Sequence, residues 1–342
     1  MVSMFIPTLN IAICTHNRAN DLKRCLQSII NDAPSFPHNI RVLVVNNNSN
    51  DSTQAIIESA IERNTRQNLE ITSIFEAKTG KINALKHVFK NCHDGHTLFL
   101  DDDNELPRGC LGLVARLIGR DQITIFGSHN IAKISGKRPY WFDSFASAYA
   151  CGTQDQLFQL TYSVWGAGMI CPSRYFRILA HDNFQFSAPG RRGKKLTSGS
   201  DSEITMVMQI CGARVEFPEN YFLFHHIDSK RLHLKYLFRL AFNFGITDTH
   251  TDPYKALIRQ QVIQEVPKRF SIIRRHLGFF LEELKSQSLS KLGLLKITFS
   301  FFYNLGYIQS YLRRYQFMKM NFIKINDFYF FCQKEKLWEK EP

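Results

Sequence analysis

The sequence lacks the features that mark several large classes of protein. It contains only 18 Gly and 11 Pro among 342 residues and shows no repeat period, which excludes collagen-like, coiled-coil and low-complexity chains. No two of its eight cysteines have the short spacing of a zinc knuckle. No uncharged stretch reaches the roughly 20 residues that a membrane-spanning helix requires.

The cysteines and the first residues favour a cytoplasmic protein. Most of the cysteines lie in apolar runs, such as 12–14 and 169–171, where cysteine acts as a small hydrophobic residue. Buried, reduced thiols are typical of the cytoplasm. Residues 1–9 lack the basic start and long apolar run of a signal peptide, and Pro7 interrupts them. We therefore expect a cytoplasmic chain.

The composition provides enough apolar material for a large core, together with an excess of positive charge. Apolar residues make up 44% of the chain and aromatic residues 13%, including 29 Phe, so disorder is excluded as the main state. The length suits about two domains of roughly 150 residues. The net charge of +13 predicts an anionic partner: nucleic acid, a phosphorylated substrate or an anionic lipid.

Strand and helix patterns alternate over roughly the first third of the chain. Helically spaced apolar residues separate buried strands, which are predicted over 10–15, 40–45, 69–75 and 97–100. This alternation is typical of an α/β fold, a mainly parallel sheet with helices on both faces. Polar clusters follow the first, second and fourth strands. We expect them to meet at the carboxyl edge of the sheet, where such sheets bind ligands.

Three carboxylates, Asp101, Asp102 and Asp103, follow the fourth strand directly. Adjacent carboxylates repel one another unless a cation offsets their charge, and hard oxygen ligands suit Mg²⁺ or Mn²⁺. A divalent ion at this place would bind a diphosphate. A solvated acidic turn is the alternative.

Three further segments contain residues that could take part in catalysis or binding, and each also has an ordinary structural explanation. Asp201 precedes a helix predicted over 202–211, where it either acts in catalysis or caps the helix. His225 and His226 follow a strand pattern and either ligate a metal or are structural. The turn over 165–169 lacks the spacing of a phosphate-binding loop, and tight packing would explain it equally well.

Taken together, these segments resemble the inverting glycosyltransferases of family 2, which have the GT-A fold. The resemblance covers residues 10–245 and rests on six segments in the family's order: 10–18, 44–51, 99–103, 165–169, 199–203 and 225–231. It implies a GT-A-like sheet with helices on both faces and a C-terminal helical region. It also implies transfer of a sugar from a nucleotide-sugar, with UDP favoured, to a hydroxyl of a glycan or lipid-linked acceptor, as in surface polysaccharide synthesis.

The resemblance implies roles for individual residues. Asp201 would remove the acceptor proton, while Asp103 and His225 would hold a divalent metal, with the imidazole favouring Mn²⁺ over Mg²⁺. The residues implied to bind the nucleotide-sugar are Thr15, Arg18, Asn46, Asn48, Lys78, Lys81, Asp101 and Asp102. Those implied to face the acceptor are Trp165, Gly166 and Gly168.

Two positions depart from the family's pattern. Asn46 stands where the family usually has an Asp that reads the uracil N3–H. An Asn carbonyl still accepts that proton, but its amide could serve a different base. Ser200 replaces the family's Glu before the base, which removes a carboxylate from the acceptor side.

The chain is expected to divide into three parts: a nucleotide-sugar-binding half over 1–120, an acceptor-binding and catalytic half over 121–245, and a basic helical region over 246–342. Residues 268–342 contain 14 Lys/Arg and 6 Asp/Glu, a net charge of +8. Residues 289–312 are apolar nearly all round. Either an interfacial helix on an anionic membrane or a helical subdomain packed on the core would explain them. The first would place the protein peripherally on the inner face of the cytoplasmic membrane.

Two other functions stay open at this point. A metal-dependent nuclease or nucleotidyltransferase would use clustered aspartates and positive charge. However, no recognition helix or RNA-binding motif occurs, so we expect no nucleic-acid partner. A non-catalytic, membrane-associated binding protein is the other alternative, but it would not need Asp103, Asp201 and His225 together.

Overall fold

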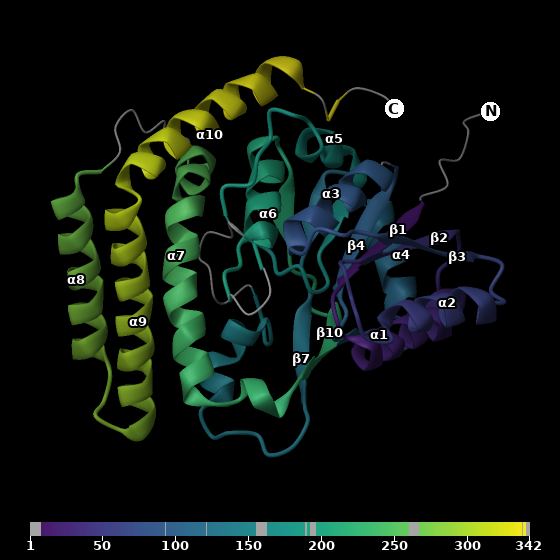
Figure 1. Ribbon diagram of the computed structural model, residues 1–342, viewed down its shortest axis with the longest axis horizontal. Helices are drawn as coiled ribbons and strands as arrows, with labels where there is room; N and C mark the ends of the chain where they lie inside the picture. The colour runs from purple at the N-terminus through teal and green to yellow at the C-terminus, as the bar shows by residue number, and fades with distance from the viewer. Residues whose placement is uncertain are drawn as a thin grey trace.

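The fold is built on a seven-stranded sheet of order β3-β2-β1-β4-β8-β6-β9, beside a smaller sheet of order β5-β10-β7 (Figure 1). The computed structural model describes residues 8–92, 94–120, 122–154, 163–188, 190–191, 196–259, 267–336 and 338–339. The large sheet contains β1 (Leu9–Thr15), β2 (Ile40–Asn46), β3 (Leu69–Phe75), β4 (His96–Asp101), β6 (Thr124–Phe126), β8 (Ile170–Pro172) and β9 (Arg214–Glu216). The small sheet contains β5 (Asn104–Glu105), β7 (His129–Ile134) and β10 (Phe222–Ile227).

The prediction of a mainly parallel α/β sheet is confirmed. Strands β3, β2, β1 and β4 are parallel neighbours, and each ends within one residue of its predicted position. Strand β8 alone runs antiparallel to its neighbours β4 and β6 in the described part of the large sheet. The four parallel strands bring their carboxyl ends to one edge, as the alternating pattern requires.

Apolar clusters cover both faces of the large sheet. One face packs against α1 (Ala19–Asp32), α2 (Thr53–Arg63) and α4 (Cys110–Arg120), and the other against α3 (Lys81–Asn91), α5 (Phe176–Leu179) and α6 (Ser200–Ile210). Strand residues alternate between the two: Ile11 and Ile13 belong to the first cluster, and Ala12 to the second. All eight cysteines are free, and seven of them are buried, as predicted.

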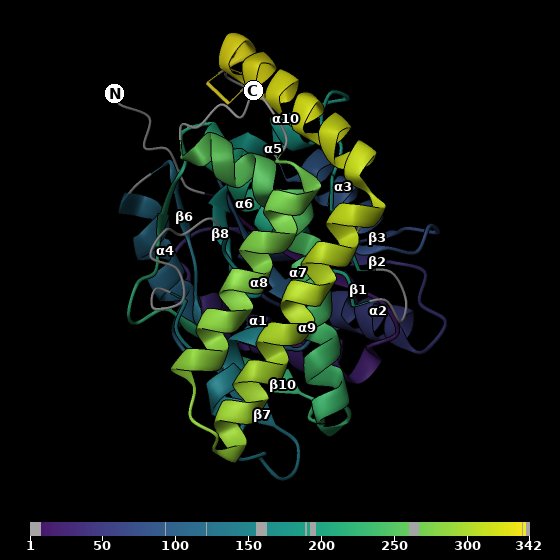
Figure 2. The same cartoon turned by 90° about the vertical axis from the view of Figure 1, so that its left-hand side faces the viewer.

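Four long helices complete the chain: α7 (Leu234–Ile258), α8 (Arg269–Ser286), α9 (Lys291–Arg313) and α10 (Tyr315–Glu335). Figures 1 and 2 show α7, α9 and α8 side by side, with α10 crossing above the core. Ile325, Phe328 and Cys332 of α10 join the cluster under α3 and α6. Leu295 of α9 belongs to a buried cluster with Leu237 and Leu240 of α7. Residues 289–312 therefore pack against the rest of the fold, one of the two alternatives for this segment.

One observation concerns the predicted division of the chain, and another concerns membrane-spanning helices. The boundary between residues 245 and 246 falls inside α7, which is one continuous helix. Among the described residues, no helix is both long and apolar enough to cross a membrane.

Candidate functional site

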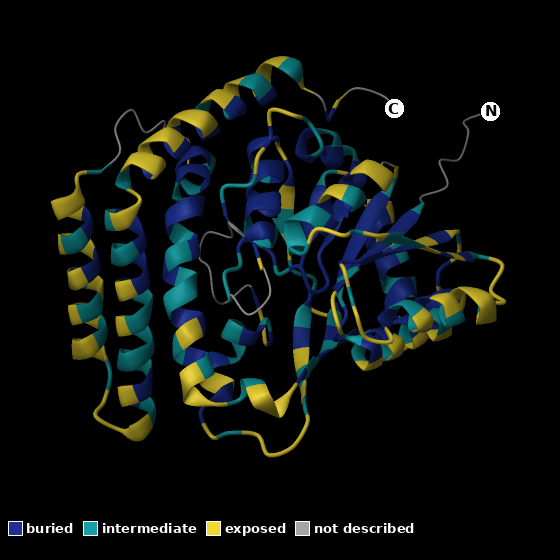
Figure 3. Cartoon of the chain, viewed as in Figure 1, coloured by how far each residue is buried: buried dark blue, intermediate teal, exposed yellow. Residues whose placement is uncertain are grey.

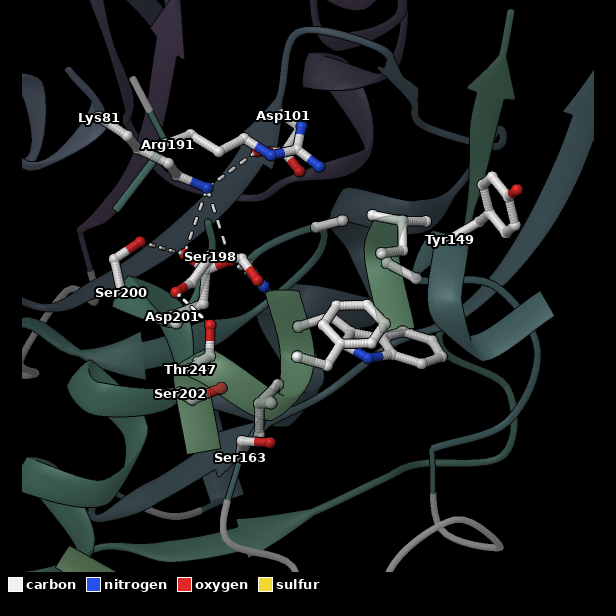
Figure 4. A pocket seen from close by; sticks show the side chains of 18 of the residues that line it. Lys81, Asp101, Tyr149, Ser163, Arg191, Ser198, Ser200, Asp201, Ser202 and Thr247 are labelled. Carbon is white, nitrogen blue, oxygen red and sulfur yellow. Dashed lines mark hydrogen bonds and ion pairs between the residues drawn. The ribbon is translucent and has the colours of Figure 1, made fainter. Parts of the chain in front are cut away.

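A cavity of about 780 Å³ opens between the carboxyl ends of β1 and β4, the start of α6, and helices α7 and α9 (Figure 4). The strands supply polar and acidic side chains at one end, and the two helices form the other. Asp201 lies between them. The cavity therefore brings together residues that are far apart in the sequence.

The strand-end clusters meet as the sequence predicted. Cys14 of β1 is paired in register with Asp101 of β4, which places the residues after both strands next to each other. The Thr15 hydroxyl donates a hydrogen bond to Asp102 Oδ2 at 2.8 Å. The backbone N–H of Asn47, just after β2, donates to the Thr15 carbonyl at 2.8 Å.

Asp103 is the most heavily paired carboxylate of the three. Its Oδ1 lies 3.1 Å from His225 Nε2, and its Oδ2 lies 3.2 Å from Arg231 Nη1 and 3.4 Å from Arg18 Nη2. Burial opposes ionisation, but His225 and the two guanidinium groups hold the pKa of Asp103 well below its usual range. The same pairing outweighs burial at His225 and raises its pKa to about 10.

The other two carboxylates have different environments. Burial and the neighbouring charge of Asp103 raise the pKa of Asp102 to about 7, despite the nearby guanidinium of Arg18. At Asp101, burial is outweighed by Lys81, which holds the pKa of that carboxyl below its ordinary value. Cations of the protein thus offset the charges of Asp101 and Asp103, whereas the repulsion by Asp103 persists at Asp102.

The adjacent histidines point in opposite directions, because successive side chains of a strand alternate. His225 faces Asp103, whereas His226 Nε2 lies 2.5 Å from Glu105 Oε2. His225 is brought there by the pairing of β10 with β5, in which His225 lies opposite Asn104.

Asp103 and His225 fit a divalent ion as a partial ligand set. Their separation of 3.1 Å is that of two neighbouring ligands each about 2.1 Å from one ion. Within the described residues, no group of three or more His, Cys, Asp or Glu gathers to hold a metal. A two-ligand site suits an ion that takes its other ligands from substrate phosphates and water. His225 would have to lose its proton to bind the ion.

Asp201 lies in the first turn of α6, rather than before the helix as predicted. The reason is Gly199, whose φ of +117° makes it the N-terminal cap and starts the helix earlier. The Gly166 N–H donates to Asp201 Oδ2 at 3.3 Å. A Cβ on Gly166 would lie only 2.6 Å from that oxygen, so the approach requires glycine.

Lys81 connects Asp201 to the strand ends. Its Nζ lies 3.2 Å from Asp201 Oδ1 and 3.3 Å from Asp101 Oδ1 (Figure 4). Burial opposes the charge of Lys81, but the two carboxylates outweigh it and raise its pKa above the ordinary value. One ammonium group thus links the acidic end of the cavity to Asp201.

Most of the residues predicted for the site line this cavity. They are Thr15, Arg18, Lys81, Asp101, Asp102, Asp103, Trp165, Gly166, Asp201 and His225. The lining does not include Asn46, Asn48, Lys78 or Gly168.

Two of the residues outside the lining are held by other contacts. The Asn46 amide donates to Gln54 Oε1 at 2.9 Å, and its carbonyl oxygen accepts from the Ser49 N–H at 3.1 Å. Gly168 has a φ of +87° and accepts a hydrogen bond from the Tyr221 hydroxyl at 2.8 Å. Both residues therefore have structural partners in the fold.

Several lining residues were not predicted from the sequence. Arg231 lies within a segment that carried the family resemblance, so a signal for it existed. The sequence contained no signal for Arg191. For the residues from α7 and α9, it showed only helical spacing. Their place depends on long-range packing of the C-terminal helices.

The sequence profile described as "Glycosyl transferase family 2" matches residues 10–181. No curated protein matches the chain. Among solved structures, the chain is similar to the mannosyltransferase PcManGT from Pyrobaculum calidifontis in complex with GDP-Man and Mn²⁺. The identity is 17% and the TM-score 0.50, over 99% of this chain and 89% of that one. This likeness supports the predicted GT-A fold.

Two weaker likenesses have a TM-score below 0.5. S. aureus TarS 1–349 in complex with UDP-GlcNAc is 15% identical with a TM-score of 0.46, over 90% of this chain and 92% of that one. GalNAc-T7 with UDP, GalNAc and Mn²⁺ is 14% identical with a TM-score of 0.49, over 77% of this chain and 52% of that one.

Proposed function

Because the chain belongs to glycosyl transferase family 2 and is a glycosyltransferase, we propose that it transfers its sugar with inversion, using Asp201 as the base. The observation that carries this proposal is the position of Asp201. It shares one cavity with the strand-end carboxylates but lies on a different element, with Lys81 between them. A single displacement needs a base on the side of the anomeric carbon opposite the leaving diphosphate.

The nucleotide-sugar, with UDP favoured, would occupy the acidic end of the cavity. Thr15, Asp101 and Asp102 offer oxygen atoms to the nucleoside, while Arg18, Arg231 and Lys81 offer positive charge to the diphosphate. Asn46, Asn48 and Lys78 lie outside the lining, and their binding to the nucleotide-sugar stays a prediction. Trp165 and Gly166 adjoin Asp201 and would face the acceptor.

Asp103 and His225 would hold the divalent ion, with Mn²⁺ favoured. The Mn²⁺ in the PcManGT complex supports this choice. When bound, the ion would supply positive charge to the leaving diphosphate.

The residues of the chain would act as follows. Asp201 accepts the proton of the acceptor hydroxyl while that oxygen forms a bond to the anomeric carbon. The bond from the anomeric carbon to the phosphate oxygen breaks, and the electron pair leaves with the nucleoside diphosphate. The Gly166 N–H orients Asp201, and the fixed cations Arg18 and Arg231 face the charge that develops on the leaving group.

The test is a screen of nucleotide-sugars for turnover with Mn²⁺, read as released nucleoside diphosphate, with water or added glycans as acceptors. Asp201→Asn should lower the rate by about 10²–10⁴, the usual contribution of a positioned base, with UDP binding retained. Asp182→Asn, at an exposed carboxylate outside the cavity, is the matched control. Loss of UDP binding in Asp201→Asn would show a role in donor binding instead. Undiminished turnover in excess EDTA would contradict the metal.

The acceptor is proposed to be a glycan or lipid-linked molecule at an anionic membrane surface. Helix α8 turns a stripe of apolar side chains outward: Phe270, Leu277, Leu281 and Leu284 have exposed fractions of 76%, 51%, 51% and 44%. Figure 3 shows this outer helix largely exposed. Exposed apolar residues within a region of net charge +8 suit an anionic lipid interface. This placement would fit surface polysaccharide synthesis.

A further inference from the structure

The cavity has a second side, which the proposed chemistry leaves without a role. Its residues are Leu240, Phe244, Asp248 and Lys255 of α7, and Phe299 and Tyr303 of α9. We call these six residues the helical wall. The spacing of the four α7 residues places them on one face of that helix.

The helical wall lies directly beside the segment that carries Asp201. The Thr247 hydroxyl of α7 donates to the Ser198 carbonyl at 2.9 Å (Figure 4). A Cβ on Gly199 would lie 2.5 Å from Thr247 Cγ2, so the Thr247 side chain packs against the Gly199 backbone as closely as glycine permits. A molecule that reaches Asp201 from the side away from Asp101 therefore lies against α7.

One half of the helical wall is polar and already oriented. Asp248 accepts a hydrogen bond from Lys255 Nζ at 2.9 Å and another from the Tyr303 hydroxyl. Its side chain keeps an exposed fraction of 32%, so acceptor capacity remains for a ligand. At Lys255, burial is outweighed by Asp248 and Asp252, which raise the pKa of its ammonium group above the ordinary value. The wall thus presents both an acceptor and a cation.

The other half is apolar and packed against neighbouring side chains. Leu240 is buried in the cluster that joins α7 to α9, and Phe299 packs against the same cluster. The ring of Phe299 lies 5.2 Å from that of Phe145, centroid to centroid, which fixes its orientation. Phe244 is half-buried and lines the cavity one turn before Asp248.

We propose that the helical wall is the acceptor-binding site and that the part of the acceptor it holds is a saccharide ring. The inference rests on the proposed function, because it takes Asp201 as the base. A sugar ring has C–H groups on its faces and hydroxyl groups on its edge, which match the apolar and the polar half. An alkyl chain would cover Asp248 and Lys255 without hydrogen bonds, at a cost in free energy.

The test measures binding of a panel of methyl glycosides of glucose, galactose, mannose and N-acetylglucosamine by saturation-transfer NMR, with UDP and Mn²⁺ present. Decyl phosphate serves as the lipid-like probe. Asp248→Asn and Phe244→Ala should each weaken glycoside binding roughly tenfold, as expected when a hydrogen bond to a charged group or an aromatic contact is lost. Tyr303→Phe, which removes one hydroxyl, should weaken binding less.

Two controls match these variants. Asp252→Asn removes the other carboxylate that pairs with Lys255, at a position outside the cavity lining. Phe238→Ala removes an aromatic ring of α7 that stacks on Phe302 instead of lining the cavity. Neither should change glycoside binding.

Several outcomes would overturn the inference. They are failure of every glycoside to bind, equal binding by the wall and control variants, or displacement of bound glycoside by decyl phosphate. If Asp248→Asn does not fold, Tyr303→Phe and Phe244→Ala decide the question. Nucleotide-sugar hydrolysis is measured separately. Loss of glycoside binding with intact hydrolysis would contradict only this inference, and absent hydrolysis with intact binding would contradict only the proposed function.

Discussion

At the scale of single residues, the site depends on charges that the protein fixes in advance. Asp103 has His225, Arg18 and Arg231 around it, and Lys81 lies between Asp101 and Asp201. These cations are in position before any substrate arrives. A diphosphate entering the cavity would therefore meet oriented groups, and little reorganisation would be needed as charge develops.

Glu203, two residues after Asp201, holds α6 in place. Its Oε1 accepts from the Ser187 N–H at 2.7 Å and the Tyr254 hydroxyl at 2.9 Å, and its Oε2 accepts from the Ala188 N–H at 3.0 Å. In Glu203→Gln, either orientation of the amide sets its nitrogen against a backbone N–H. We expect a loss of about 1–3 kcal/mol in the free energy of unfolding, measured by denaturant titration.

The same side chain predicts a dependence of stability on pH. Burial raises the pKa of Glu203 from 4.5 to about 7, although its three hydrogen-bond donors oppose this. The folded state then binds more protons than the unfolded state between these values. The contribution of Glu203 to the free energy of unfolding is therefore complete below pH 4.5 and is lost as the pH rises through 7.

The measurement compares the free energies of unfolding of the wild-type protein and Glu203→Gln from pH 4.5 to 8. The advantage of the wild type should shrink as the pH rises. An advantage that grows with pH would show that the three donors outweigh burial and that the pKa of Glu203 is lowered.

Several site residues could be predicted because they directly follow strands. Asp101 to Asp103 and Thr15 are fixed by the ends of β4 and β1, and strand alternation distinguishes His225 from His226. The partners of these residues were harder to predict. Lys81 meets Asp201 across 120 positions of sequence, and no local pattern encodes such a contact.

At the scale of elements, the regular half of the fold could be predicted and the middle could not. Strands β1 to β4 and helices α1 to α3 show clear periodicities, and each buries a defined face. Between residues 128 and 199 the described elements are short strands and helical turns. Their pairing, such as β8 between β4 and β6, is set by long-range hydrogen bonds.

The contact between α7 and α9 depends on two glycines. A Cβ on Gly245 would lie 2.0 Å from the Tyr303 carbonyl oxygen, and one on Gly306 would lie 2.0 Å from the Phe242 carbonyl oxygen. Both distances are too short for any side chain. Glycine therefore sets how closely the helices approach and, with that, where Phe299 and Tyr303 face the cavity.

We expect Gly306→Ala to separate the two helices. The overpacking should lower the free energy of unfolding by about 1–3 kcal/mol. The control is Gly278→Ala in α8, where an added Cβ meets nothing within 4 Å. That change should raise stability by about 0.5–1 kcal/mol, because alanine favours helix more than glycine does. Denaturant titration of both variants checks this, and equal stability in the two would refute the close-packing argument.

At the scale of the whole molecule, the helical region packs on the α/β core and helps to enclose the cavity. Helix α9 lines the cavity, and α10 packs into the core beside α3 and α6. The sequence predicted a helical region of this kind but could not show which faces turn inward, because α9 is apolar nearly all round. Removing these helices would open the cavity, so truncation is a poor test of any surface function.

Helix α8 lies at the edge of the helical region, on the far side of α9 from α7, and presents the candidate membrane surface (Figure 1). Its apolar residues Leu277, Leu281 and Leu284 follow one another at spacings of four and three, with Arg274 one turn before them. Each Lys or Arg near an anionic surface contributes roughly 1 kcal/mol, and salt screens this attraction. Inserted leucines contribute a part that salt does not remove.

Flotation with liposomes separates the two contributions. The wild-type protein should float with anionic liposomes at low salt, float less at high salt, and keep a residual bound fraction. The full-length variant with Leu277, Leu281 and Leu284 replaced by Ser should lose that residual fraction. Phe75→Ser is the control: Phe75 is an exposed residue of β3, and this strand lies on the opposite side of the molecule from α8 (Figure 1). Unchanged flotation of the triple variant would place the contact elsewhere, and no flotation of the wild type would show that the stripe does not bind membrane.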